Sequence, residues 1–182
     1  MSKQVQTIQQ ITQYGRLKLG HIPLDLTTAR IISANAIQNT TEGGVPDGDT
    51  AGPALGRVNG ATDKALRLTW AATQVNEVQF APVALPPDLD PAAGMEIHLL
   101  AAKNANANTF NIAVAAFFGV GDANAGGNTD NIAQALAEYK VTLAAADVPA
   151  PPNVLNVSLT PAAHAGDALY VNAAWIQYTR KA

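Results

Sequence analysis

Three histidines of this sequence could bind a metal through their imidazole nitrogens. They are His21, His98 and His164, and we expect none of them to have a second histidine or a carboxylate at the close spacing that a metal site needs. We therefore expect them to be ordinary surface or partly buried polar residues.

Two close pairs of aspartates, Asp47 with Asp49 and Asp88 with Asp90, could bind calcium through their oxygens. Neither pair has the spacing of a helix–loop–helix calcium site. Aspartate also caps its own backbone in tight turns, and we favour that role for both pairs. A metal at either pair remains the alternative.

The sequence contains no recognisable catalytic motif. It has no cysteine, and its only serines are Ser2, Ser33 and Ser158, none of them in the Gly-x-Ser-x-Gly pattern of a nucleophile elbow. The glycine-rich stretch 119–128 departs from the Gly-x-Gly-x-x-Gly pattern of a dinucleotide-binding loop at Asn124. We expect neither enzymatic activity nor a cofactor.

Four aromatic side chains could form a platform on which a sugar ring stacks: Trp70, Trp175, Tyr170 and Tyr178. Both tryptophans continue an apolar strand face, and aromatic residues make up only 5% of the chain. We therefore favour packing in the core or in an interface, with sugar binding as the alternative.

Composition restricts the possible partners. Charged residues are 14% of the 182 residues, against about 25% in a typical soluble domain, and the formal net charge is −3. These values do not suit a dedicated nucleic-acid-binding protein. The longest apolar run, residues 112–120, is shorter than the ~20 residues that span a bilayer. We expect no nucleic-acid or membrane partner, and a surface covered in part by other subunits.

The elements that must position these side chains are β-strands. Apolar and polar residues alternate in seven segments, and turn residues separate them. The segments are 65–70, 75–80, 95–101, 110–118, 136–143, 154–160 and 168–179. This pattern predicts an all-β fold, an antiparallel β-sandwich of which the jelly roll is the best specific form.

The first third of the chain has no sustained period. Residues 42–60 are rich in Gly, Pro, Asp and Thr, which is typical of a loop. We therefore predict an extended N-terminal arm and loop over residues 1–62, followed by the sandwich domain over residues 63–182. Four basic residues, Lys3, Arg16, Lys18 and Arg30, face only one acidic residue within the first thirty.

Several stretches of the chain resemble structural proteins of tailed-phage virions, of the capsid decoration (cement) or head-fibre kind. They are Val58–Trp70, Pro82 with Leu85–Asp90, Gly166–Val171 and Trp175–Lys181. The resemblance implies a homotrimer whose termini reach neighbouring subunits. It also implies that the chain is made in the host cytoplasm and located in the virion. There it would bind the assembled shell, through the major capsid protein or another virion protein, and stabilise it by bridging subunits.

Contacts with these partners are expected at the basic arm and at the apolar end of the last strand. The residues concerned are Lys3, Arg16, Lys18, Arg30, Trp175 and Tyr178. The last strand is apolar on both sides toward its end, and a partner chain can cover one of them. Two alternatives remain: a phage fibre or tail protein, and a carbohydrate-binding jelly-roll module.

Overall fold

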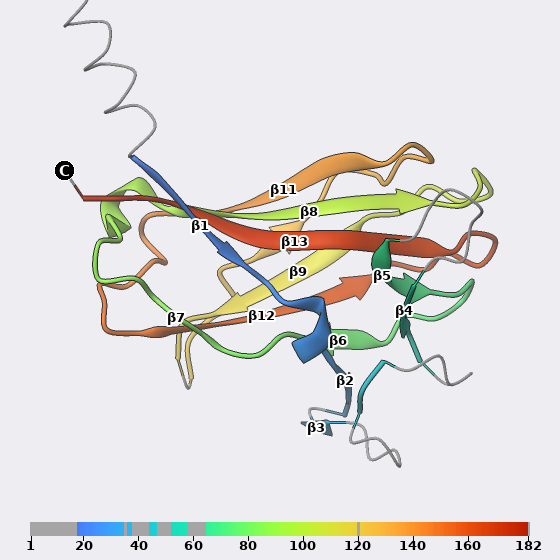
Figure 1. Ribbon diagram of the computed structural model, residues 1–182, viewed down its shortest axis with the longest axis horizontal. Helices are drawn as coiled ribbons and strands as arrows, with labels where there is room; N and C mark the ends of the chain where they lie inside the picture. Colours follow the sequence, from blue (N-terminus) through green and yellow to red (C-terminus); the bar gives the residue numbers. More distant parts are fainter. Residues whose placement is uncertain are drawn as a thin grey trace, which may run out of the picture.

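A computed structural model describes residues 18–34, 36–37, 44–46, 52–57, 65–119 and 121–181. The chain forms two antiparallel β-sheets that pack against each other, with two short 3₁₀ turns and no α-helix among these residues. Figure 1 shows the long strands β8, β11 and β13 of one sheet running alongside β9 and β12, which belong to the other sheet. The predicted all-β sandwich of jelly-roll type is confirmed.

The first sheet is centred on the long strand β13. Its strand order is β11-β8-β13-β5-β4, and β1 pairs with the other end of β13. The bounds are β1 Leu19–Pro23, β4 Ala54–Arg57, β5 Leu66–Trp70, β8 Met95–Lys103, β11 Ala137–Leu143 and β13 Leu169–Thr179.

The second sheet is centred on β9 and β12. Its strand order is β10-β9-β12-β6-β2-β3, and β7 also pairs with β12. The bounds are β2 Arg30–Ser33, β3 Ala36–Ile37, β6 Glu77–Gln79, β7 Val83–Ala84, β9 Ile112–Phe117, β10 Gly127–Asn128 and β12 Val154–Pro161. The 3₁₀ turns η1 and η2 span Leu26–Thr28 and Pro91–Ala93.

The core lies between the sheets and follows from strand alternation. Every second residue of β8, such as Ile97 and Leu99, is buried against the second sheet, where Leu155 and Leu159 of β12 are buried in return. Burying each such side chain contributes about 1.5–3 kcal/mol. Each of the seven segments predicted from alternation contains a strand. No helix in the described ranges is long and apolar enough to cross a membrane.

A β-bulge in β13 decides which of its side chains face outward. The pairing of β13 with β8 shifts between Val171 and Ala173, so one extra residue is inserted at Asn172. Before the bulge Val171 faces the core, and after it Ile176 does. Simple alternation placed Trp175 on the same side as Val171, and the bulge turns Trp175 to the outer face instead. The prediction that Trp175 continues a core face was wrong for this reason.

The predicted boundary at residue 62 also needs correction. Strands β1 and β4 belong to the first sheet, and β2 belongs to the second. Strand β4 lies inside the segment 42–60 that was predicted to be a loop. The sandwich therefore includes strands β1, β2 and β4 as well, because these short strands gain their hydrogen bonds from later ones. Residues 1–17 of the predicted arm lie outside the described residues.

Candidate functional site

The outer face of the first sheet carries a cluster of polar and aromatic side chains from four neighbouring strands. Register places His98 of β8 between Lys140 of β11 and Trp175 of β13. It also places Glu96 of β8 beside Gln177 of β13. We call the following residues the outer-face cluster: His21, Glu96, His98, Glu138, Lys140, Trp175 and Gln177.

Hydrogen bonds connect this cluster across the strands. His21 Nε2 lies 3.0 Å from Gln177 Oε1, and Gln177 Nε2 donates to Glu96 Oε2 at 3.2 Å. Lys140 Nζ donates to Glu96 Oε1 at 2.7 Å. Because Gln177 accepts at one end of its amide and donates at the other, the row runs continuously from β1 to β11.

His98 fixes the position of Trp175. The His98 and Trp175 rings stack with their centroids 5.1 Å apart and an interplanar angle of 13°. His98 Nδ1 lies 2.6 Å from Glu138 Oε1, while Nε2 lies 3.3 Å from Glu96 Oε2 without hydrogen-bond geometry. The side chain of His98 is only 6% exposed. Trp175 remains half-buried, so the indole is held in place and still reaches solvent.

Charge in the cluster is stabilised locally. The hydrogen bond from Lys140 holds the pKa of Glu96 below its ordinary value, although partial burial opposes this. The same bond raises the pKa of Lys140. A shallow hollow of about 140 Å³ lies beside Glu96 and Gln177. The face therefore presents an aromatic ring, fixed charges and amide groups next to a small depression.

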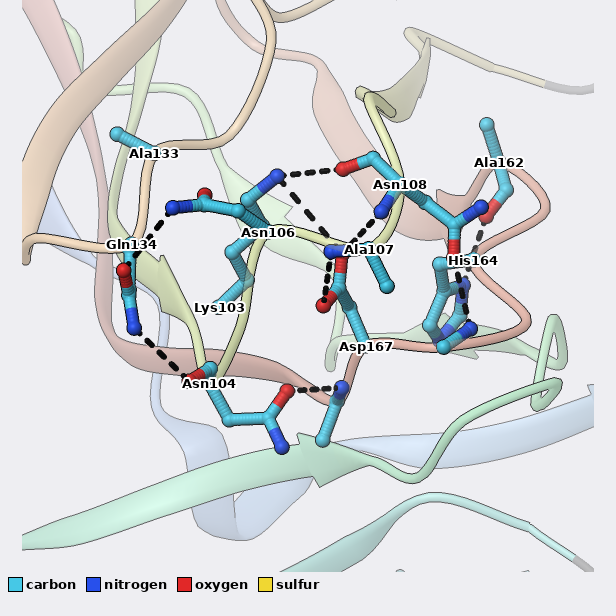
Figure 2. Close-up of polar contacts among 12 residues, drawn as sticks. Lys103, Asn104, Asn106, Ala107, Asn108, Ala133, Gln134, Ala162, His164 and Asp167 are labelled. Atoms are coloured by element: carbon cyan, nitrogen blue, oxygen red, sulfur yellow. Dashed lines mark hydrogen bonds and ion pairs between the residues drawn. The ribbon is translucent and has the colours of Figure 1, made fainter.

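A second polar cluster lies at the loop end of the sandwich, and Figure 2 shows its contacts. We call it the loop-end cluster: Lys103, Asn104, Asn108, His164 and Asp167. Asp167 is fully buried and accepts from the backbone N–H groups of residues 107 and 108 at 3.1 and 2.7 Å. Lys103 is 7% exposed, donates to the Asn108 carbonyl at 2.5 Å and lies 3.8 Å from Asp167 Oδ2.

The remaining members of the loop-end cluster tie three loops together. Asn104 Oδ1 accepts from the Ala168 N–H at 2.7 Å. His164 is fully buried, with its two ring nitrogens 2.7 and 3.2 Å from the carbonyls of Ala162 and Ala71. Its ring stacks on Phe110 with centroids 4.9 Å apart.

The pKa of Asp167 reflects this setting. Burial raises it, but the backbone N–H groups of Asn108 and Ala107 and the charge of Lys103 outweigh burial, so the pKa lies below its ordinary value. The polar groups of the loop-end cluster thus form their hydrogen bonds and ion pair within the protein. We therefore assign this cluster a structural role.

Those predicted partner-binding residues that the structure describes do not form one patch. Lys3 and Arg16 lie outside the described residues, and Lys18 is exposed just before β1 of the first sheet. Arg30 lies in the second sheet, where its Nη1 donates to the Ala29 carbonyl at 2.7 Å. The clustering of Lys18 with Arg30 in the sequence is therefore not a clustering in space.

The two aromatic residues predicted to bind a partner face opposite sides of the first sheet. Trp175 belongs to the outer-face cluster. Tyr178 is 6% exposed and faces the core, with its hydroxyl 3.2 Å from Asp88 Oδ1. Only Trp175 is placed to contact a ligand.

The aspartates that could bind a metal have separate partners in the fold. Asp88 lies 3.3 Å from Arg180 Nε, and Asp90 accepts from the Ala92 N–H at 3.2 Å at the start of η2. Asp90 thus has the predicted turn role. Asp47 and Asp49 lie outside the described residues. Within the described part of the chain, no three His, Asp or Glu side chains form a group that could hold a metal.

Sequence reasoning missed most of the outer-face cluster. Alternation did place Glu96, His98, Glu138 and Lys140 on the polar side of their strands. It could not show that β8 lies between β11 and β13, or in what register. The sequence shows which residues lie on the polar face of each strand. Which polar faces lie side by side depends on the order of the strands in the sheet.

Comparisons with known proteins give the fold. No protein-family model matches the chain, and no curated protein matches it. Among solved structures, the K1 cleaved adhesin domain of Lys-gingipain from Porphyromonas gingivalis W83 is similar with a TM-score of 0.52 and 14% identity. That match covers 86% of this chain and 97% of the adhesin domain.

Xylanase 10C from Cellvibrio japonicus, solved with xylopentaose, is similar with a TM-score of 0.50 and 12% identity over 86% of this chain. The chain spans 28% of that protein and 28% of a xylanase 10B from Clostridium thermocellum. The xylan-binding module CBM15 has a TM-score of 0.48 and 11% identity, with 90% of this chain and 99% of the module covered. At these identities the likeness to the adhesin domain and to xylanase 10C shows a shared fold and nothing more.

Proposed function

We propose that this chain is a non-catalytic module that binds a polysaccharide on the outer face of its first sheet. One observation carries the proposal: the bulge at Asn172 turns Trp175 outward, and the stack on His98 holds it among fixed donors and acceptors. A ring that is already held in place loses little conformational entropy when a ligand packs against it.

The chemistry of the outer-face cluster matches that of a sugar. A pyranose ring offers C–H groups that pack on an aromatic surface, and hydroxyl groups that both donate and accept hydrogen bonds. Trp175 supplies the aromatic surface. Glu96 supplies acceptor oxygens, and Gln177 and Lys140 supply donors. A shallow, solvent-exposed face suits an extended chain better than a small molecule, which prefers an enclosed pocket.

The structural neighbours are compatible with this role. One of them, a xylanase of which this chain spans 28%, was solved with xylopentaose, and another is an adhesin domain. Xylopentaose is therefore a reasonable first ligand, together with a panel of soluble polysaccharides.

The test is calorimetric titration of the chain with xylopentaose and with that panel. We expect Trp175→Ala to weaken binding at least 10-fold. Phe117→Ala is the matched control, because Phe117 is an exposed aromatic residue on the outer face of the second sheet. If no polysaccharide binds the unmodified chain, or if only Phe117→Ala weakens binding, the proposal is wrong.

A capsid decoration role is the second candidate. Besides the sequence resemblance, it is favoured by the exposed side chains of Phe117 and Val154 on the second sheet, since apolar exposure is typical of surfaces that another subunit covers. Light scattering separates the two candidates. A stable trimer of the 18.8 kDa chain that binds no polysaccharide would favour the decoration role.

A further inference from the structure

Arg67 of β5 is a cation on the outer face of the first sheet, and none of its N–H groups donates to a residue that the structure describes. Its guanidinium carbon lies 3.6 Å from the centroid of the Tyr170 ring. Across the described ranges no carboxylate pairs with Arg67 and no oxygen accepts from it. By contrast, Lys140 on the same face is already neutralised by Glu96 at 2.7 Å.

Stacking on Tyr170 orients the guanidinium without consuming its N–H groups. All five donors of an arginine lie in the plane of its fork, and contact with an aromatic ring uses the face of that plane. The side chain of Arg67 is half-buried, so it is already partly ordered. An anion that binds it therefore gains paired hydrogen bonds at a small cost in side-chain entropy.

The surroundings of Arg67 leave room for a ligand. The residue opposite Arg67 on β4 is Gly56. A Cβ atom built on Gly56 would meet no atom within 4 Å. Thr69, two residues along β5, lies on the same outer face as Arg67. Arg67 is thus covered by Tyr170 on one side and open toward Gly56 on the other.

We propose that Arg67 binds the carboxylate of an acidic sugar, so that the ligand of this face is a uronate-containing polysaccharide. This inference rests on the proposed function and names its ligand class. The planar guanidinium fork matches a carboxylate in a two-bond arrangement. Tyr170 and Trp175 are five positions apart along β13, roughly 15 Å in an extended strand. One polysaccharide chain of several sugar units can therefore contact both Arg67 and Trp175.

The experiment compares acidic polymers with their neutral counterparts. Glucuronoxylan and polygalacturonate are each titrated beside the carboxyl-reduced form of the same polymer, against the unmodified chain, Arg67→Gln and Arg67→Lys. We expect the acidic form of at least one polymer to bind at least 10-fold more tightly than its reduced form. Arg67→Gln should remove that difference and leave binding of the reduced form unchanged. Arg67→Lys should restore part of it, because charge returns without the fork.

Trp175→Ala separates this inference from the proposed function. If acidic and reduced polymers bind equally and Trp175→Ala weakens both, the polysaccharide role stands and the role of Arg67 is wrong. An equal loss for both forms in Arg67→Gln also overturns the role of Arg67. If neither form binds, the proposed function and the inference fail together. Thermal unfolding of each variant confirms that it is folded.

Discussion

The loop-end cluster and the outer-face cluster combine similar side chains in different surroundings. Each contains a histidine, a lysine and a carboxylate, and a tryptophan lies in or beside each cluster. In the loop-end cluster these are His164, Lys103 and Asp167. The tryptophan beside it is Trp70, which precedes Ala71 in the chain, and the Ala71 carbonyl lies 3.2 Å from His164 Nε2. In the outer-face cluster they are His98, Lys140, Glu96 and Trp175.

The difference lies in burial and in what remains to be bonded. Lys103 is 7% exposed and Asp167 is fully buried, whereas the side chains of Lys140 and Glu96 are 60% and 25% exposed. Buried polar groups must be satisfied inside the protein, because an unpaired one costs free energy. Exposed groups can exchange their partners for water or for a ligand. The comparison therefore assigns stability to the first cluster and recognition to the second.

The tryptophans provide the largest contrast. Trp70 is fully buried and its Nε1 donates to the Asn76 carbonyl at 2.9 Å, so Trp70→Ala should lower the free energy of unfolding by about 4 kcal/mol. Trp175→Ala removes a half-exposed ring and its stack on His98, and should cost about 1 kcal/mol. Urea denaturation of both variants measures the two values. Equal losses would show that Trp175 belongs to the core, as strand alternation alone predicts.

The two tryptophans also show how far the sequence determines the structure. Alternation identified the strands that carry both residues and the sandwich class, because burial of one face forces a period of two. It placed Trp70 correctly and Trp175 incorrectly. A single inserted residue, Asn172, moves every later side chain of β13 to the opposite face of the sheet. Nothing in the local sequence marks this bulge.

The early strands were missed for a related reason. β1 and β2 are short, and β1 contains Pro23, which cannot donate to a ladder. β1 is a strand because it pairs with β13, and β2 is a strand because it pairs with β6. Pairing between segments so far apart in the chain leaves no pattern in the local sequence. The outer-face cluster depends on both effects, since it needs the bulge for Trp175 and the pairing of β1 for His21.

The lysines give the next contrast. Lys103→Met removes the charge beside the buried Asp167 and the bond to the Asn108 carbonyl, and should cost about 3 kcal/mol. Lys140→Met is the matched control, and it should change stability little because an exposed ion pair contributes little in water. Chemical denaturation at neutral pH measures both.

The same two lysine variants should rank in the opposite order when their polysaccharide affinity is measured instead of their stability. Lys140→Met should weaken polysaccharide binding, whereas Lys103→Met, under conditions where it is folded, should not. A Lys103→Met variant as stable as Lys140→Met would contradict the structural role of the loop-end cluster.

The carboxylates give the smallest contrast, which appears in the pH dependence of stability. The pKa values of Asp167 and Glu96 both lie below their ordinary values of 3.8 and 4.5. Each folded-state carboxylate therefore stabilises the protein above its unfolded pKa, and this stability is lost as the pH falls through the folded pKa. We expect the free energy of unfolding to be level near neutral pH and to decrease below about pH 4.5.

Salt separates the two carboxylates. The Glu96–Lys140 pair is exposed, so 0.5 M NaCl should screen it, whereas Asp167 is held mainly by buried backbone N–H groups that salt does not reach. Glu96→Gln should thus flatten the acid decline at 0.05 M NaCl and have less effect at 0.5 M. Asp167→Asn should flatten it equally at both salt concentrations, because the titrating group itself is gone. If the effect of Asp167→Asn fell with salt as that of Glu96→Gln does, Asp167 would be as exposed as Glu96. The division of the two clusters into a buried structural one and an exposed binding one would then fail.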